Sequence, residues 1–248
     1  GSQLVLRGAW WWTRWQDSGR PPPVRAVDGT HWDGHSPTSA NFLRDRMSPR
    51  SGPTTEILLA SGQPPRVVVR THHAVMDGGG HLHFVADLFR CLRGEAPQGS
   101  DGTVTDLDLA RRLGAQRPAP RRPDCLAPTG ASEGEQEGVT WRRVFVPGRH
   151  SDLLPRIAVS LAEQAREHGQ GRVRIDVPVD LRQHFDEPLG SLANLTGMLH
   201  VDVEPDTRPE ELGAQIRAQI ASRRHAEFVI EMAPARFLPK ARRWSVPL

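Results

Sequence analysis

Apolar positions in the first hundred residues follow a strand pattern and then a helical one. Thr55–Ala60 and Val67–Val69 are rich in β-branched and aliphatic residues, and the segment Gly62–Pro65 between them consists of turn-forming residues. We therefore expect these two strands to form an antiparallel pair. After Gly80 the apolar residues recur every three or four positions as far as Arg93-Gly94, which predicts a helix.

The second half of the chain also alternates between strand and helix patterns. Thr207 and Glu210 have the spacing of a capping box, with Pro209 in the first turn of the helix that they would open. Thr105 and Asp108 have the same spacing and predict a short helix. The other predicted elements are strands at Val139–Val146, Arg172–Val179 and Leu192–Val203 and a helix at Ser151–His168.

A Pro- and Gly-rich segment separates these two halves. Residues 116–138 are dominated by Pro, Gly, Ala, Arg and Glu, and so long a stretch without secondary structure is uncommon inside a compact domain. The sequence therefore predicts an N-terminal lobe over residues 3–115, a mobile crossover over 116–138 and a C-terminal lobe over 139–248. A tryptophan cluster near the start, Trp10–Trp12 with Trp15, is interpreted as anchoring the core, with an exposed aromatic patch for a partner as the alternative.

Composition and charge exclude several kinds of partner. Hydrophobic residues make up 37% and charged residues 25% of the 248 residues, which is typical of a globular protein. The pI of about 9.6 accompanies a formal net charge of only +3, because Lys240 is the only lysine and tyrosine is absent. There is no basic stripe with interleaved aromatics and no long apolar run, so we expect no nucleic-acid or membrane partner and a cytoplasmic location. Cys91 and Cys125 fit neither a disulfide framework nor a metal-binding spacing.

Candidate chemistry is concentrated where the Val67–Val69 strand ends. His72 and His73 follow this strand, and neighbouring strand residues point to opposite faces, so the two rings are expected in different surroundings. Asp77 then opens the glycine run Gly78–Gly80, which lets backbone or ligand approach closely.

The block His72-His73-x-x-x-Asp77-Gly78 resembles the signature of the chloramphenicol acetyltransferase-like superfamily. That superfamily includes the condensation domains of nonribosomal peptide synthetases and stand-alone acyltransferases that use coenzyme A or carrier-bound thioesters. Two later features are also similar to condensation domains: a strand that ends in Arg182 and the Gly-x-x-x-Asn segment Gly190–Asn194. The resemblance spans roughly residues 54–93 and 139–224.

The resemblance implies an α/β fold: a pseudo-dimer of two lobes around a tunnel, each lobe an α+β two-layer sandwich. It implies that His73 faces the tunnel as the catalytic general base and that His72 is structural. Asp77 and Gly78 would support the active strand, and Asp77 would form an ion pair with Arg182 that makes its burial tolerable. Asn194 is either a polar group that lines the tunnel or a turn residue at the start of a strand.

Several family features have no match in this chain. The early arginine-rich helix is missing, only seventy-one residues precede His72, and the late Asp-Phe-Gly-Trp-type segment does not occur before Leu248. We therefore expect a truncated fragment, a shortened variant or a pair of lobes completed by another chain.

The implied activity is condensation-type acyl transfer, as in nonribosomal peptide synthesis and other secondary metabolism. An acyl group would move from a pantetheine thioester, on coenzyme A or a carrier protein, to an amine or hydroxyl acceptor. The thioester is a substrate, so no bound cofactor is expected, and further domains of the same polypeptide are expected partners. Histidine suits the proton transfer, and backbone N–H groups at Gly78–Gly80 could stabilise the oxyanion. Gly79 and Gly80 would also leave room for the pantetheine arm.

Three other functions compete with acyl transfer. A catalytically inactive condensation-like module would keep the fold and dock a carrier protein or a neighbouring domain. A metal site formed from the histidines and the aspartate is less favoured, because neighbouring histidines diverge, so no metal is expected. A serine hydrolase is disfavoured because no nucleophile-elbow motif occurs. The residues that would form the metal site are His72, His73, Asp77, His81 and His83.

Overall fold

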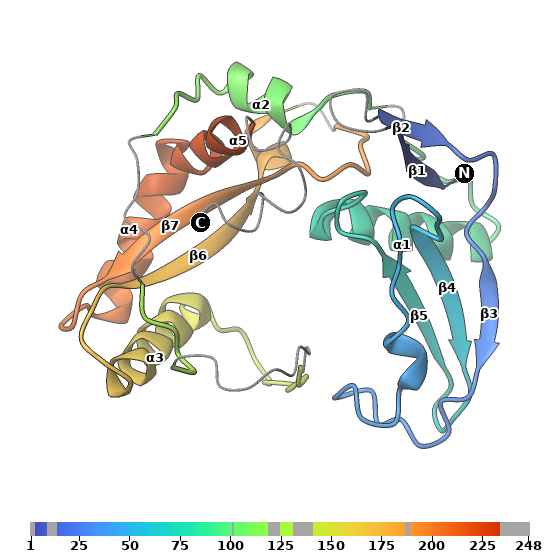
Figure 1. Cartoon of the computed structure of the whole chain (residues 1–248), viewed down its shortest axis with the longest axis horizontal. Coiled ribbons are helices and arrows are strands. Elements are labelled where there is room, and N and C mark those ends of the chain that lie inside the picture. The colour runs from blue at the N-terminus through green and yellow to red at the C-terminus, as the bar shows by residue number, and fades with distance from the viewer. Residues whose placement is uncertain are drawn as a thin grey trace. The chain divides into compact units, whose positions relative to one another are not determined.

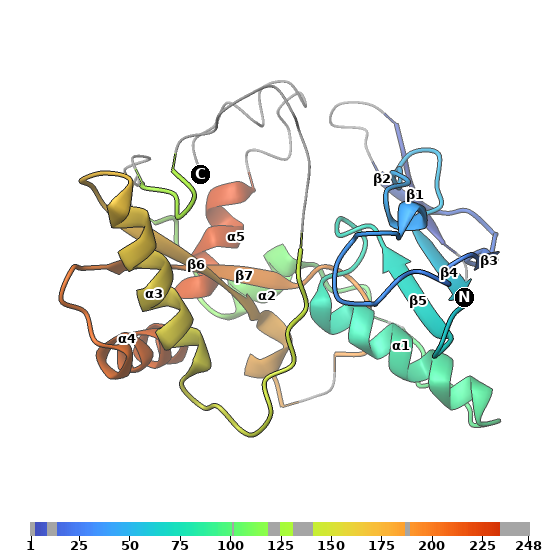
Figure 2. The ribbon, with the colours of Figure 1, turned by 90° about the horizontal axis from the view of Figure 1, so that it is seen from below.

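The computed structural model describes residues 3–8, 14–100, 102–118, 125–130, 141–186 and 189–233. The chain divides into two compact units, whose elements appear in Figures 1 and 2. Unit 1 comprises Gly1–Thr103, Glu137–Pro147 and Leu189–Asn194, and unit 2 comprises Val104–Gln136, Gly148–Pro188 and Leu195–Leu248. Each unit is therefore assembled from separate stretches of the chain.

These boundaries differ from the three continuous ranges that the sequence predicts. Residues 104–115 belong to unit 2 and not to the N-terminal lobe, whereas 139–147 and 189–194 belong to unit 1. Contacts between distant stretches decide this division, and a pattern of apolar residues along the chain carries no information about them. Most of the predicted crossover, and Trp10–Trp12, lie outside the described residues.

Unit 1 contains a three-stranded sheet with the order β3-β4-β5. The central strand β4 (Thr55–Ala60) pairs in parallel with β3 (Val24–Val27) and antiparallel with β5 (Arg66–Thr71). A separate pair joins β1 (Leu4–Arg7) to β2 (Arg14–Asp17), and Trp15 in β2 is 39% exposed. The predicted hairpin is confirmed, and β5 is longer than the predicted Val67–Val69 because its polar ends continue the ladder with β4.

Helix α1 (Gly78–Leu92) follows β5 after a short turn, which confirms the predicted helix. It runs beside the β3-β4-β5 sheet and lies behind β4 and β5 in Figure 1. A short 3₁₀ helix, Asn41–Leu43, lies in the connection between β3 and β4.

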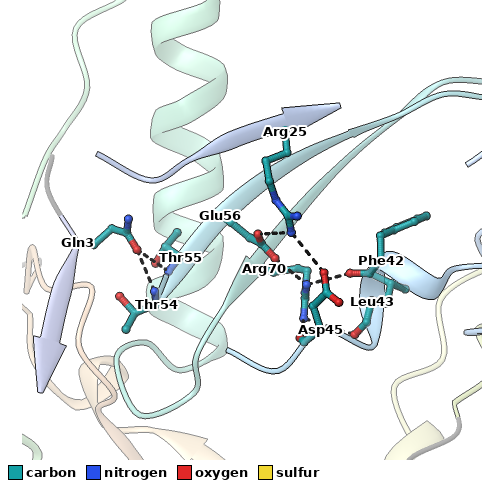
Figure 3. A network of polar contacts seen from close by, with 9 residues as sticks. All are labelled: Gln3, Arg25, Phe42, Leu43, Asp45, Thr54, Thr55, Glu56 and Arg70. Carbon is teal, nitrogen blue, oxygen red and sulfur yellow. Dashed lines mark hydrogen bonds and ion pairs between the residues drawn. The ribbon is translucent and has the colours of Figure 1, made fainter. Parts of the chain in front are cut away.

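A buried carboxylate joins the three strands of this sheet. Glu56 in β4 is 2% exposed, and its oxygens accept hydrogen bonds from Arg25 of β3 at 2.8 Å and from Arg70 of β5 at 2.6 Å. Arg70 stands directly opposite Glu56 in the strand register. Figure 3 shows that its guanidinium also reaches the connecting loop, where it donates to the carbonyl oxygen of Phe42 at 2.9 Å. Since a buried charge is costly without partners, this network favours one alignment of the strands.

Unit 2 is a two-stranded sheet covered by helices. β6 (Val173–Asp180) pairs antiparallel with β7 (Thr196–Val203). The alternation of half-buried and buried residues along β7 gives the sheet one apolar face, which packs with α3 (Leu153–Glu167) and α4 (Pro209–Ala221). The remaining helices are α2 (Asp106–Arg112), α5 (Glu227–Met232) and the 3₁₀ helices Leu181–His184 and Arg224–Ala226. The buried core consists of Ala158, Ala162, Ala165, Val173, Val177, Val179, Leu199, Val201, Val203, Leu212 and Ile216.

The helices of unit 2 largely follow the prediction. The Thr105–Asp108 capping box is present at the start of α2.

Helix α3 has 15 residues, as does α1 in unit 1, whereas about 20 are needed to cross a bilayer. None of the helices in the described part of the chain is long and apolar enough for a membrane span.

Three sequence expectations are wrong in detail. The described part of the predicted strand at Val139–Val146, residues 141–146, belongs to no strand. β7 begins at Thr196, four residues after the predicted start at Leu192. Helix α4 has Arg208 as its N-cap, and its capping carboxylate is Glu211, so the predicted Thr207–Glu210 box is shifted by one residue. The shift places Pro209 at the first helical position, where its fixed φ and missing N–H fit best.

A pair of histidines is buried in unit 2. His225 is 0% exposed, and its Nε2 lies 2.8 Å from Nε2 of His184. Burial, and then the neighbouring His184, lowers the pKa of His225 to about 4. The backbone around His225 packs tightly, because a Cβ on Gly197 would lie 2.4 Å from the carbonyl oxygen of His225. The folded protein therefore holds the His225 ring neutral near pH 7.

We expect removal of the Glu56 charge to destabilise unit 1. Glu56→Gln leaves two guanidinium groups facing a neutral side chain, and breaking a buried ion pair costs about 3–5 kcal/mol. The measurement is the free energy of unfolding in urea. Glu95→Gln is the control, because Glu95 is 41% exposed beside Arg93 and an exposed pair contributes little. Equal unfolding free energies for Glu56→Gln and wild type would contradict the role given to this network.

We also expect stability to fall in mild acid because of His225. In the unfolded chain this ring takes up a proton near its ordinary pKa of about 6.5, whereas in the folded protein it does so only near pH 4. The stabilisation is therefore complete above about pH 6.5 and is lost as the pH falls towards 4.

Between pH 7 and pH 5, wild type should lose on the order of 1–2 kcal/mol more unfolding free energy than His225→Leu. The exposed His31 supplies the control: His31→Gln should keep the wild-type pH dependence. Parallel pH profiles for wild type and His225→Leu would show that His225 does not cause the loss.

Candidate functional site

The end of β5 places His72 and His73 in different surroundings. The backbone N–H of His72 donates to the carbonyl oxygen of Thr54 at 2.8 Å and so prolongs the pairing with β4. The ring of His72 is half-buried, and its Nδ1 accepts a hydrogen bond from the N–H of Ala74 at 3.1 Å. His73 is exposed. The two rings thus have different surroundings, although β5 ends at Thr71 and His73 lies in the turn that follows.

A tight turn connects the histidines to α1. The N–H of Val75 donates to the carbonyl oxygen of His72 at 2.8 Å, and the side chains of Val75 and Met76 are each 8% exposed. Asp77 follows as the N-cap of α1, where its Oδ1 accepts from the N–H of Gly80 at 2.7 Å. The side chain of Asp77 is 3% exposed, and the positive end of the helix dipole favours a carboxylate at this position.

Gly80 is required by a close backbone contact. A Cβ at this position would lie 2.2 Å from the carbonyl oxygen of Leu192, whereas a Cβ on Gly78 would meet nothing within 4 Å. The expected room for a pantetheine arm beside Gly80 is therefore occupied by the segment 189–194. The expected oxyanion role also fails for the Gly80 N–H, because Asp77 accepts its hydrogen bond.

The segment 189–194 is held from a second direction by Ser100 and Gly102. The N–H of Leu192 donates to Oγ of Ser100 at 3.2 Å, and the N–H of Gly102 donates to the carbonyl oxygen of Gly190 at 3.2 Å. Ser191 between them is 3% exposed. The segment therefore has a fixed position in unit 1 although it is distant in sequence from the rest of that unit.

Side chains of α1 hold the start of this supporting loop. Oδ1 and Oδ2 of Asp87 accept hydrogen bonds from the N–H groups of Gln98 and Gly99, each at 2.8 Å. These bonds lower the pKa of Asp87, with that from Gln98 the largest cause. Nε2 of His83 lies 2.9 Å from the carbonyl oxygen of Gly99 and 3.7 Å from Asp87. We did not predict this support, although the i, i+4 spacing of His83 and Asp87 was a visible signal.

Asn194, at the end of this segment, reaches His73. Its amide nitrogen lies 3.2 Å from Nδ1 of His73 and 3.1 Å from the carbonyl oxygen of the same residue. Two residues that the resemblance singles out, 121 positions apart, are thus hydrogen-bonded within one unit. The site in unit 1 is an exposed imidazole held at its Nδ1 edge by an amide.

Arg182 lies in unit 2, in the 3₁₀ helix Leu181–His184 that follows β6. Its backbone N–H and its Nη1 both donate to Oδ1 of Asp180, each at 2.9 Å. The Asp77–Arg182 ion pair stays a prediction.

The other histidines of the motif region have protein partners of their own. Nδ1 of His81 lies 3.1 Å from Oγ1 of Thr71, and burial lowers the pKa of His81. His83 faces Gly99 as described above. Within the described residues, no group of three or more His, Cys, Asp or Glu side chains could hold a metal ion.

We expect Gly80→Ala to disturb the site and Gly78→Ala to leave it intact. The added methyl group at Gly80 would force the Leu192 backbone away from α1, at a cost of about 1–3 kcal/mol. At Gly78 there is space, and alanine favours the helix. Thermal denaturation checks the stability, and the NMR shifts of Asn194 and His73 report the local geometry. Indistinguishable behaviour of the two variants would contradict the close packing of Gly80.

Comparison with known proteins gives matches to solved structures only. No family model and no curated protein matches the sequence. The starter condensation domain of rhizomide synthetase RzmA, in complex with C8-CoA, superposes with a TM-score of 0.54 at 14% identity and covers 96% of this chain. F. sporotrichioides TRI101 complexed with coenzyme A and T-2 gives 0.57 at 12% identity over 100% of the chain. The tallysomycin biosynthesis protein TlmII gives 0.54 at 15% identity over 97%.

The likeness extends over almost all of this chain but over only part of each known structure. The chain covers 63% of the RzmA domain, 66% of TRI101 and 64% of TlmII. Identities this low establish the fold and not the activity. The chain therefore has the chloramphenicol acetyltransferase-like fold of the condensation domains, as its His-His-x-x-x-Asp-Gly block predicts, over slightly less than two thirds of their length.

Proposed function

We propose that this chain is a condensation-type acyltransferase that moves an acyl group from a pantetheine thioester to an amine or hydroxyl. The observation that carries this proposal is the exposed imidazole of His73 at the end of β5, hydrogen-bonded to Asn194 on a fold of this kind. The buried elements around it, Asp77 and Gly80, supply a rigid support for one exposed reactive side chain.

His73 acts in this proposal as the general base. The amine or hydroxyl attacks the thioester carbonyl carbon, so that a new C–N or C–O bond forms and the C–S bond breaks. The nucleophile loses its proton to the imidazole, which then passes it to the departing thiolate. Histidine suits both transfers, because an imidazole can accept a proton at one step and donate it at the next.

The donor is proposed to be a thioester of coenzyme A or of a carrier protein. Two structures of the same fold contain C8-CoA and coenzyme A, which supports a thioester of this type. The thioester is consumed as a substrate, so the proposal includes no resident cofactor.

The Asp77–Arg182 ion pair belongs to the same proposal as a support for the site. Asp77 already accepts the Gly80 N–H, and a carboxylate with 3% exposure gains further stabilisation from a guanidinium partner. The N–H groups of Gly78 and Gly79 remain candidates for stabilising the oxyanion.

The alternative proposal is an inactive module of the same fold that docks a carrier protein or a neighbouring domain. The chain spans slightly less than two thirds of its structural neighbours. Further domains of the same polypeptide, or another chain, would then complete the site.

The test is acyl transfer from octanoyl coenzyme A, and from an octanoyl carrier protein, to a panel of amines and alcohols. His73→Ala should lower turnover by about 10²–10⁴-fold, the usual contribution of a positioned base. The exposed His31 again supplies a control, and His31→Ala should keep wild-type turnover. Equal turnover in His73→Ala and wild type would remove the proposed base. A wild-type chain that binds the carrier protein but turns over no substrate would favour the docking module.

A further inference from the structure

The amide of Asn194 can adopt only one orientation beside His73. The atom that faces His73 lies 3.1 Å from a backbone carbonyl oxygen, which accepts hydrogen bonds and cannot donate them. The amide oxygen of Asn194 at this place would put two acceptors together. The chemistry therefore fixes the NH₂ group at this position, although the two ends of an amide have nearly the same shape.

The same NH₂ group also determines the state of the ring. It carries two hydrogens and has two neighbours: the carbonyl oxygen and, at 3.2 Å, Nδ1 of His73. A proton on Nδ1 would make this contact donor against donor. Nδ1 of the neutral ring is therefore an acceptor, and the single proton of the ring lies on Nε2.

We propose that Asn194 is a positioning residue that fixes the tautomer of His73, with the proton on Nε2. The segment 189–194, packed against Gly80 and bonded to Ser100, holds the amide in place. Because Asn194 donates to Nδ1, the opposite nitrogen, Nε2, carries the proton and can donate a hydrogen bond to a ligand.

This tautomer changes how the proposed acyl transfer would begin, and this step rests on that proposed function. With the proton on Nε2, His73 first donates a hydrogen bond, for which the thioester carbonyl oxygen is the suitable acceptor. The ring accepts a proton at Nε2 only after Nε2 has released its own proton to water and Nδ1 has taken one up from water, to which the exposed ring is open. That form requires the Asn194 amide to leave Nδ1, so Asn194 controls when the base becomes available.

His72 provides an internal reference. Its Nδ1 accepts from the backbone N–H of Ala74 at 3.1 Å, which also places the proton of the neutral ring on Nε2. Substitution of Asn194 does not alter this backbone donor. The two neighbouring rings should therefore share a tautomer in wild type and differ when residue 194 is changed.

The experiment is ¹⁵N–¹H NMR of the histidine side chains of the whole chain at about pH 9, where an ordinary imidazole is neutral. The nitrogen shifts distinguish the two tautomers, and spectra of His72→Ala and His73→Ala assign the two rings. Wild type should carry the His73 proton on Nε2. Asn194→Asp keeps the shape but offers only acceptor oxygens, so the proton of His73 should move to Nδ1. Asn194→Ala should shift the ratio of tautomers towards Nδ1–H by several-fold.

Either of two results would overturn the proposal: a wild-type His73 with its proton on Nδ1, or the same tautomer ratio in wild type, Asn194→Asp and Asn194→Ala. A change in His72 along with His73 would also count against it, because it would indicate a general disturbance of the turn. The outcome does not depend on turnover. Loss of the proposed acyl transfer and loss of the tautomer assignment can therefore be told apart.

Discussion

The contact between Gly80 and the carbonyl oxygen of Leu192 is the constraint on which the candidate site depends. It allows the segment 189–194 to lie directly against the first turn of α1, where any side chain at position 80 would intrude. Asp77 caps that turn and so fixes its direction relative to the end of β5. As a result, Asn194 meets His73 although the chain between them passes through unit 2.

Two buried carboxylates support unit 1 by different means. Asp77 is stabilised at the N-terminus of α1, where a backbone N–H and the helix dipole favour a negative charge. Glu56 lies in the middle of a sheet, where no helix end is available, and it is neutralised by Arg25 and Arg70. The first carboxylate orients the helix behind the site, and the second aligns the strands that deliver His72 and His73.

Local features of this fold could be predicted from the sequence, and distant pairings could not. The β4-β5 hairpin and α1 followed from β-branched residues, turn residues and apolar spacing, because these preferences act over a few residues. The resemblance singled out both His73 and Asn194, but it did not predict their hydrogen bond, because the two residues are 121 positions apart in the sequence. Residues 141–146 show the limit of prediction from residue types: they are rich in β-branched and aromatic side chains, yet they form no strand, and the backbone N–H of Arg143 donates to the carbonyl oxygen of His35.

Each unit consists of separate stretches of the sequence, and this limits where the polypeptide can be divided. A gene cut in the connection after residue 103, or after residue 147, separates unit 1 from the strip that carries Asn194. Recombination of this polypeptide, in nature or in the laboratory, would preserve the histidine site only if one parent sequence supplies both β5 and the segment 189–194. The two units must therefore be inherited together, because their segments alternate along the sequence. A crossover point between residues 73 and 194 would combine a histidine and an asparagine from different parent sequences.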